Sequence, residues 1–117
     1  MEKMVVIINE APGSMKAWNA LRIAEGLLSQ QVEVAVFLLD NGVFVAKAGQ
    51  APMEGLKELN LADKVSRLAD LGVKVNVCQT CANQKGLKTE ELAPGSRISN
   101  LVELAQAIKE SRQTLVF

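Results

Sequence analysis

The sequence predicts a three-layer α/β domain, in which a mainly parallel sheet of about five strands lies between layers of helices. Two observations predict this fold class. Short apolar runs rich in β-branched residues recur along the chain, each of a length typical of a buried strand. Segments with apolar residues at helical spacing separate these runs, an alternation typical of flavodoxin-like and Rossmann-like sheets. The 117 residues are expected to form a single domain, residues 1–117, without a repeat or linker.

A strand, a helix and a second strand account for the first third of the chain. Residues 3–9 form a continuous apolar run, which is typical of a strand buried on both faces. Residues 15–31 follow a helical period, and Ser14 is placed to cap that helix. Residues 32–39 repeat the pattern of the first strand. This start is typical of a parallel sheet.

The segment after residue 39 has two interpretations. Asn41-Gly42 between apolar runs is a strong hairpin signal, with residues 43–46 as the returning strand. The preceding helix and the unalternating apolar strand favour a parallel sheet, in which the loop leads into another helix. We favour the short helix, followed by a surface loop at residues 49–53.

The rest of the chain continues the alternation. Expected helices are 56–71, 79–85 and a last one after Asn100, and expected strands are 73–78, 97–99 and 114–117. Asn60 is a possible helix cap, and Gly72 stands where a helix commonly ends. Residues 89–92 form at most one helical turn. The last helix has an apolar stripe, formed by Leu101, Leu104, Ala105 and Ile108.

Composition excludes several classes of function. The chain has no His, which excludes Ser-His-Asp and Cys-His hydrolases and any His-ligated metal site, and two cysteines cannot fill a four-ligand zinc site. Neither phosphate-binding glycine motif occurs, and we expect no cofactor. The net charge is zero, which argues against a nucleic-acid partner. The sequence has no apolar run of about 20 residues and no signal-peptide pattern, so we expect a cytoplasmic protein without membrane contact.

The candidate chemistry lies at Cys78, which ends the strand 73–78 and forms a C-x-x-C pair with Cys81. In an open α/β sheet, ligands bind outside the carboxyl ends of the strands. A thiol there faces free backbone N–H groups at the start of the next helix, and their partial positive charge favours the thiolate. Cys78 is therefore the first candidate catalytic residue and Cys81 the second. Each could instead be a packed apolar residue, because free cysteines are often buried.

The chain resembles the DsrE/DsrF-like family of small sulfur-relay proteins over nearly its whole length. The segments that carry the likeness are VAVFLLDNGV (34–43), VCQTCANQKGL (77–87) and the ending from ELAPG (91–95) to LVF (115–117). In that family, a cysteine eight residues before the glycine of an Arg-Gly or similar pair carries sulfur as a persulfide. Cys78 stands eight residues before Gly86, with Lys85 in place of the common Arg.

The resemblance also implies partners and assembly. It implies proteins that donate sulfur to the chain and accept it, and a homo-oligomer, either a trimer or a hexamer. It further implies that the loop 40–42 leads into a helix near the cysteine. Independently, the hydrophobic fraction of 49% and the apolar run 43–46 predict an exposed apolar surface, which usually marks an interface.

Five further residues are candidate substrate-binding residues, because they follow strand ends or flank the cysteine helix: Asn9, Pro12, Asp40, Gly42 and Lys85. Asn9 and Pro12 follow the first strand on the edge where Cys78 is expected. Asp40 lies near Cys78 if their strands are neighbours, although a loop residue that bonds its own turn is the simpler interpretation. Lys85 could supply positive charge to a thiolate or be solvated at a helix end.

Three functional hypotheses follow. The first is an intracellular sulfur-handling protein, a candidate sulfurtransferase, in which Cys78 accepts sulfane sulfur and passes it on by thiol exchange. The second is a thiol–disulfide redox protein that uses Cys78 and Cys81 as a pair. The third is a non-enzymatic oligomeric binding module on the same fold, because fold alone does not determine function.

Overall fold

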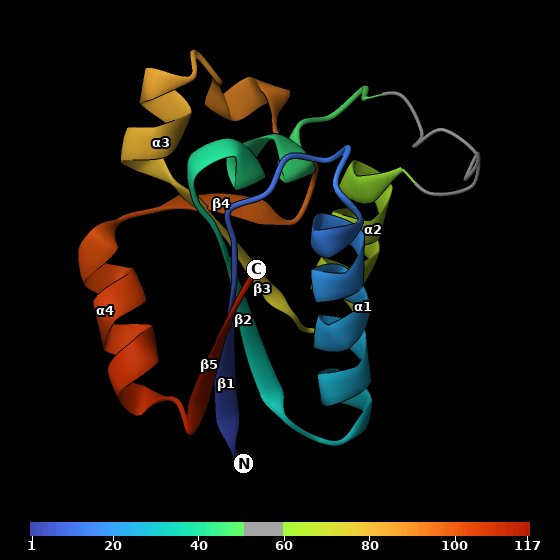
Figure 1. Ribbon diagram of the computed structural model, residues 1–117, viewed down its shortest axis with the longest axis vertical. Coiled ribbons are helices and arrows are strands. Elements are labelled where there is room, and N and C mark those ends of the chain that lie inside the picture. Colours follow the sequence, from blue (N-terminus) through green and yellow to red (C-terminus); the bar gives the residue numbers. More distant parts are fainter. Residues whose placement is uncertain (51–59) are drawn as a thin grey trace.

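The computed structural model describes residues 1–50 and 60–117 (Figure 1). Within them, five parallel strands form one sheet in the order β4-β3-β2-β1-β5. The strands are β1 (Lys3–Ile8), β2 (Glu33–Leu38), β3 (Lys74–Cys78), β4 (Ser96–Ser99) and β5 (Gln113–Val116). The α-helices are α1 (Met15–Ser29), α2 (Leu61–Asp70), α3 (Gln79–Gln84) and α4 (Leu101–Glu110), with 3₁₀ helices η1 (Asp40–Ala46) and η2 (Thr89–Glu91). The predicted α/β fold class is confirmed.

The order of the strands determines which helices cover which face of the sheet. From β1 to β4 the chain moves in one direction across the sheet, and α1 and α2 cover one face. It then returns past three strands through α4 to β5. Because crossovers are right-handed, this reversal places α4 on the opposite face, as Figure 1 shows. The helices α3 and η1 lie over the carboxyl ends of the strands.

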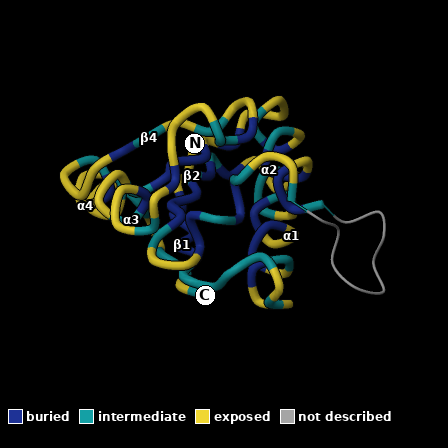
Figure 2. Tube along the Cα trace, turned by 90° about the horizontal axis from the view of Figure 1, so that it is seen from above, coloured by how far each residue is buried: buried dark blue, intermediate teal, exposed yellow. Residues whose placement is uncertain are grey.

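The face under α1 and α2 holds the main hydrophobic core. Alternate residues of the central strands point into it, and all are fully buried: Val34, Val36, Leu38, Val75 and Val77. The buried alanines of α1 let this helix approach the sheet closely: Ala17, Ala20 and Ala24. In Figure 2 the buried residues gather at the sheet and on the inner side of α1.

The face under α4 is packed far less. Its buried apolar cluster consists, among the described residues, of Val5, Ile7, Phe37 and Leu104. The apolar stripe expected on the last helix was therefore only partly right. Leu104 faces the sheet, whereas Leu101, Ala105 and Ile108 are exposed. A single short helix contacts the sheet through one narrow side, formed by Leu104 and the half-buried Ala107, so the rest of the stripe faces outward.

The segment after β2 is η1, so the helix interpretation is confirmed over the hairpin. Asp40 has a φ of 50°, and Gly42 packs directly on the end of β1. A Cβ at Gly42 would lie 2.0 Å from the backbone oxygen of Ile8, so a glycine is required here. Val43, Val45 and Ala46 are fully buried inside the domain. The idea that this run forms an exposed apolar surface was wrong, because η1 turns it inward onto the core.

The start of α2 is set by its cap. The side chain of Asn60 accepts hydrogen bonds from the backbone N–H groups of Ala62 and Asp63, so the predicted cap is confirmed and α2 begins at Leu61. The earlier part of the expected helix 56–71, and most of the expected loop 49–53, lie outside the described residues. Gly72 follows the helix with a φ of 108°, as expected for a terminating glycine.

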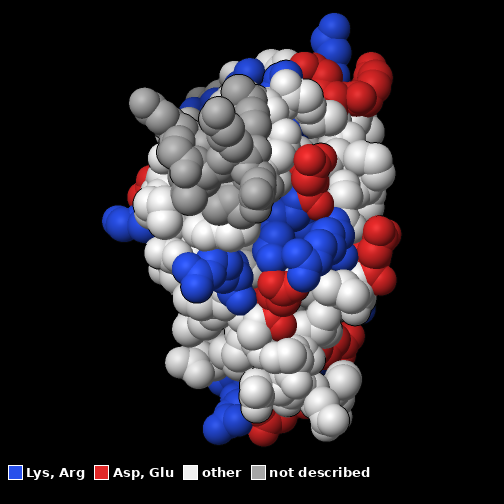
Figure 3. Space-filling model, turned by 90° about the vertical axis from the view of Figure 1, so that its right-hand side faces the viewer, with Lys and Arg blue, Asp and Glu red and all other residues white. Residues whose placement is uncertain are grey.

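The outer surface of the α1 and α2 layer carries charges of both signs side by side (Figure 3). Glu25 of α1 bridges two cations of α2, with 2.6 Å from its Oε1 to Lys64 Nζ and 2.6 Å from its Oε2 to Arg67. The hydrogen bond from Lys64 is the main cause that lowers the pKa of the Glu25 carboxyl. Lys64 is buried and also lies over the Trp18 ring, so this cluster ties α1 to α2.

No helix within the described residues is long and apolar enough to cross a bilayer.

Candidate functional site

Cys78 is the last residue of β3 and the N-cap of α3, as the sequence predicted. Its backbone is still extended, and the chain turns into the helix at the next residue. The Cys78 Sγ accepts a hydrogen bond from the backbone N–H of Cys81 at 3.5 Å. The cysteine sulfur thus takes the position that a serine or aspartate oxygen occupies in most helix caps, beside the backbone donors of the first turn.

Strand alternation directs the Cys78 side chain to the α4 face of the sheet. Val75 and Val77 belong to the core on the other face, so strand alternation turns Asn76 and Cys78 toward α4. Cys78 stands at the strand end, where it lines the cavity under α4 and also packs against the edge of the main core. On the neighbouring strand, Ser99 pairs in register with Cys78, and its side chain points the same way as that of Arg97, which reaches α4. Cys78 and Ser99 therefore lie side by side beneath the first turn of α4.

A small cavity lies at this point. Its walls are the strand-end residues Phe37, Leu39, Cys78 and Ser99 and the α4 residues Asn100, Leu101 and Leu104. Its volume of about 10 Å³ has room for one atom the size of a water molecule. Most of its wall is hydrocarbon, so the cavity is a compact apolar space with a thiol and a hydroxyl at one side.

Cys81 lies one helical turn beyond Cys78 and is half-buried. Burial raises the pKa of the Cys81 thiol above its ordinary value of 9.0; the neighbouring Cys78 adds to the rise, and a hydrogen bond from the Asp40 backbone opposes it. Both cysteines are free thiols. Because the thiolate is the nucleophilic form, Cys81 is poorly placed to make the first attack on a sulfur donor.

Asp40 and Lys85 form the outer rim of the site. Asp40 begins η1, directly after β2, and its carboxylate lies 3.4 Å from the Nζ of Lys85 at the end of α3. The structure also brings Asp40 near Cys81, because the Asp40 backbone is one of the groups that shift the pKa of the Cys81 thiol. Lys85 was expected to supply positive charge to a cysteine thiolate. In the structure the Asp40 carboxylate partly neutralises that charge.

The other three candidate residues lie toward β1, two strands away from β3. The backbone N–H of Asn9 donates to the Phe117 carbonyl at 2.8 Å, which joins the end of β1 to the residue after β5. The presence of a glycine at position 42 is explained by its close packing on the Ile8 backbone, without the need for a role in substrate binding. Asn9, Pro12 and Gly42 share the carboxyl edge with Cys78 but do not line its cavity.

Sequence reasoning missed the residues that complete the cavity, above all Ser99. A serine at the end of a short strand, before a capped helix, is an ordinary feature, and only the strand order places it beside Cys78. The side chain of Leu101 was predicted to face the core, but it is largely exposed at the first turn of α4.

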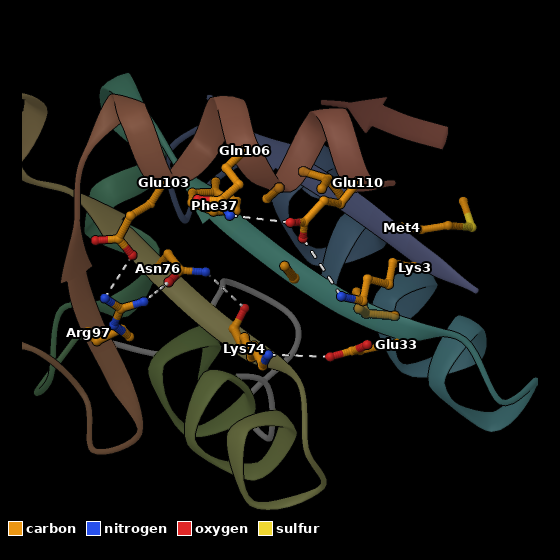
Figure 4. Close-up of a pocket in the computed structure, with 14 residues that line it drawn as sticks. Lys3, Met4, Glu33, Phe37, Lys74, Asn76, Arg97, Glu103, Gln106 and Glu110 are labelled. Atoms are coloured by element: carbon orange, nitrogen blue, oxygen red, sulfur yellow. Dashed lines mark hydrogen bonds and ion pairs between the residues drawn. The ribbon is translucent and has the colours of Figure 1, made fainter. Parts of the chain in front are cut away.

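A second, larger hollow lies under the other end of α4 and has a volume of about 210 Å³ (Figure 4). Three ion pairs line it: Lys3 with Glu110, Lys74 with Glu33, and Arg97 with Glu103. The buried Asn76 accepts a hydrogen bond from Arg97 and donates to the Val36 carbonyl. No cysteine lines this hollow, and its charges neutralise one another in pairs, so the smaller cavity is the better candidate for chemistry.

Comparison with known proteins agrees with the family resemblance. Residues 2–117 match the model of the DsrE/DsrF-like family. The chain is 40% identical over 116 residues to the uncharacterized protein MJ0989 of Methanocaldococcus jannaschii, covering 98% of this chain and 99% of that one. It is 35% identical over 120 residues to YchN of Escherichia coli, with all of both chains covered, and the crystal structure of that protein matches with a TM-score of 0.90. It is also 30% identical over 120 residues to the sulfurtransferase TusD of Salmonella newport, with 92% of each chain covered.

Proposed function

This chain belongs to the DsrE/DsrF-like family, and from that premise we propose that it handles sulfane sulfur and carries it as a persulfide on Cys78. The likeness to the sulfurtransferase TusD supports sulfur relay as the general function. The observation that carries the choice of residue is the position of Cys78 at the carboxyl edge of the sheet, with its Sγ at the start of α3 and against a cavity of atomic size. We place the reaction in the cytoplasm, where thiols are kept reduced.

The proposed transfer is a pair of thiol exchanges. The Cys78 thiolate attacks the outer sulfur of a donor persulfide, R–S–SH. The donor S–S bond breaks, R–S⁻ leaves, and Cys78 becomes Cys78–S–SH. An acceptor thiolate then attacks the same outer sulfur, takes it with its proton, and releases the Cys78 thiolate. Neither step changes the total oxidation state, and neither needs a histidine base, which this chain lacks.

The protein environment supports this exchange in two ways. The backbone N–H of Cys81 faces the Cys78 sulfur, where negative charge resides before attack and after release. The raised pKa of the Cys81 thiol lowers the thiolate fraction of the second cysteine, so Cys81 competes less for the donor. Asp40 and Lys85 form a rim of opposite charges around the site, and we propose that they contact the partner protein.

The second candidate function is thiol–disulfide exchange, and the contact between the two cysteines favours it. Because the Cys81 N–H bonds to the Cys78 Sγ, the pair has the spacing of a dithiol at a helix start. In that case the Cys78 thiolate attacks a substrate disulfide and releases one substrate thiolate. The Cys81 sulfur then resolves the mixed disulfide, releasing the second thiolate and leaving a Cys78–Cys81 disulfide.

We also propose that the protein works with sulfur donor and acceptor proteins and assembles into a homo-trimer or a homo-hexamer. Leu101 and Val102 support a protein-binding surface beside Cys78, since they are 74% and 76% exposed at the first turn of α4. Light scattering at micromolar concentration measures the assembly, and a mass near the 12.6 kDa of one chain contradicts it.

The test of the proposed function compares the wild type with Cys78→Ser and Cys81→Ser. Each protein is incubated with glutathione persulfide, and intact mass and cyanide-labile sulfur are measured. We expect one added sulfur on the wild type and on Cys81→Ser, and none on Cys78→Ser. Thermal melts control for folding, and we expect Cys78→Ser to stay within about 1 kcal/mol of the wild type.

Two results would contradict the proposal. Sulfur bound by Cys78→Ser at the wild-type level would assign the chemistry elsewhere. A wild type that takes up no sulfur but forms a reversible Cys78–Cys81 disulfide of defined potential would support the redox function instead.

A further inference from the structure

Ser99 carries a polar group that the fold leaves without a partner. The residue is only 3% exposed, and its Oγ has no hydrogen-bond partner among the described residues. Buried hydroxyl groups are nearly always hydrogen-bonded, because leaving one unpaired costs the desolvation of that group. Ser96, on the same strand, shows the usual arrangement, with its Oγ donating to the Ala93 carbonyl at 2.6 Å. The unpaired hydroxyl of Ser99 therefore needs an explanation.

The position of Ser99 supplies one. It lies directly opposite Cys78 in the register of β3 and β4, and both side chains line the cavity under α4. Neighbouring strands lie about 4.8 Å apart, and a sulfur–sulfur bond is about 2 Å long. A second sulfur bonded to the Cys78 Sγ can therefore extend from β3 toward β4 and come within hydrogen-bond distance of the serine.

The size and lining of the cavity fit that second sulfur. Its volume of about 10 Å³ suits one atom. The remaining walls are mainly the apolar side chains of Phe37, Leu39, Leu101 and Leu104. Sulfur is polarizable and weakly hydrated, so it is suited to an apolar space with a single donor.

We propose that the outer sulfur of the Cys78 persulfide occupies this cavity and accepts a hydrogen bond from the Ser99 Oγ. This inference rests on the proposed function and adds a positioning residue to it. Ser99 makes and breaks no covalent bond. Its hydroxyl gains a partner when sulfur is loaded, and the cover of Leu101 and Leu104 restricts the access of small thiols to that sulfur.

The test uses Ser99→Ala, which removes the hydroxyl and keeps the cavity, with Ser96→Ala as the matched control on the same strand. Each full-length protein is loaded with glutathione persulfide, separated from the donor and exposed to dithiothreitol, and sulfur loss is followed by intact mass. We expect Ser99→Ala to lose its sulfur several-fold faster than the wild type, and Ser96→Ala to lose it at the wild-type rate.

A second readout separates positioning from folding. Sulfur loading should raise the Tm of the wild type, because the buried hydroxyl becomes paired, and this increment should shrink in Ser99→Ala. The unloaded Ser99→Ala should melt at or above the wild-type temperature, since it loses an unpaired polar group. Ser99→Thr, which keeps the hydroxyl and fills the cavity with a methyl group, should take up less sulfur than the wild type.

The outcomes distinguish this inference from the proposed function. A wild type that never takes up sulfur overturns both. If the wild type takes up sulfur and Ser99→Ala loses its sulfur no faster than the wild type, only the role of Ser99 is overturned. Full loading of Ser99→Thr overturns the placement of the sulfur in the cavity, and it does so even if Ser99→Ala fails to fold.

Discussion

The two faces of the sheet differ in how completely they are filled. Under α1 and α2, alternate residues of the strands and the inner sides of both helices form one large, fully buried cluster. Under α4, a small apolar cluster separates a polar hollow at one end from the Cys78 cavity at the other. The strand-end residues Cys78 and Ser99, which supply the thiol and the hydroxyl of that cavity, line it on the α4 side of the sheet.

This difference shows how a small domain combines stability with a reactive site. The filled face contributes most of the apolar burial, and hence most of the stabilisation, at about 25 cal/mol for each Å² removed from water. The thinly covered face can then leave space beside a thiol without loss of the fold.

The largest expected difference is between two leucines of the same chemistry on opposite faces. Leu68 of α2 is fully buried in the main core, and Leu104 of α4 is 5% exposed and borders the small cavity. We expect Leu68→Ala to lower the free energy of unfolding by roughly 3–5 kcal/mol, and Leu104→Ala by roughly 2–3 kcal/mol, because a site beside existing space relaxes more easily. Urea denaturation measures both, and an equal or larger loss for Leu104→Ala would show that the α4 face is packed as tightly.

The next largest expected difference is between the stability contributions of two ion pairs, one on the α1 and α2 side of the molecule and one on the α4 side. The pKa of Glu25 is lowered in the folded state, so its contribution to stability is present above the unfolded value, near 4.5, and is lost as pH falls through the folded value. We expect Glu25→Gln to cost about 1–2 kcal/mol at pH 7, because it leaves the buried Lys64 without its carboxylate, and to abolish that part of the acid sensitivity.

The control is Glu110→Gln on the α4 side. Glu110 pairs with Lys3 at 3.7 Å, and both side chains are about half exposed, so we expect a loss under about 0.5 kcal/mol. Urea denaturation at several pH values between about 3 and 7, the range in which carboxylates titrate, compares the two variants. Equal losses at pH 7 would contradict the burial argument.

The smallest expected difference concerns the two thiols. Cys78 should react faster than Cys81 with iodoacetamide at neutral pH, by roughly fivefold, which corresponds to about 1 kcal/mol of activation free energy. The reason is the raised pKa of the Cys81 thiol, so the difference should narrow as the pH rises. Peptide mass mapping after brief labelling measures the ratio, and faster labelling of Cys81 would reverse the assignment of the nucleophile.

Much of the fold could be predicted because its signals are local. Apolar runs gave the strands, and Asn60, Gly72 and Asn100 mark helix ends through backbone contacts close in the sequence. The position of Cys78 at a strand end was confirmed for the same reason. Its reactivity and its partners stay predictions.

The rest depended on contacts that a single sequence does not show. Which side of the last helix is buried depends on the narrow contact between α4 and the sheet, so Leu101 was misplaced. The pairing of Ser99 with Cys78 requires the strand order. The need for Gly42 arises from the end of β1, which is distant in the sequence.

The position of β1 between β2 and β5 has a consequence for how the chain folds. Met4 pairs with Gln113, a separation of 109 residues (113 minus 4), so this contact closes one of the longest loops in the domain. Pairings of such high contact order form slowly, and during synthesis β1 keeps one unpaired edge until β5 has emerged. Its exposed N–H and C=O groups are meanwhile a template for strands of other chains, so aggregation of nascent or truncated chains is expected to begin at β1.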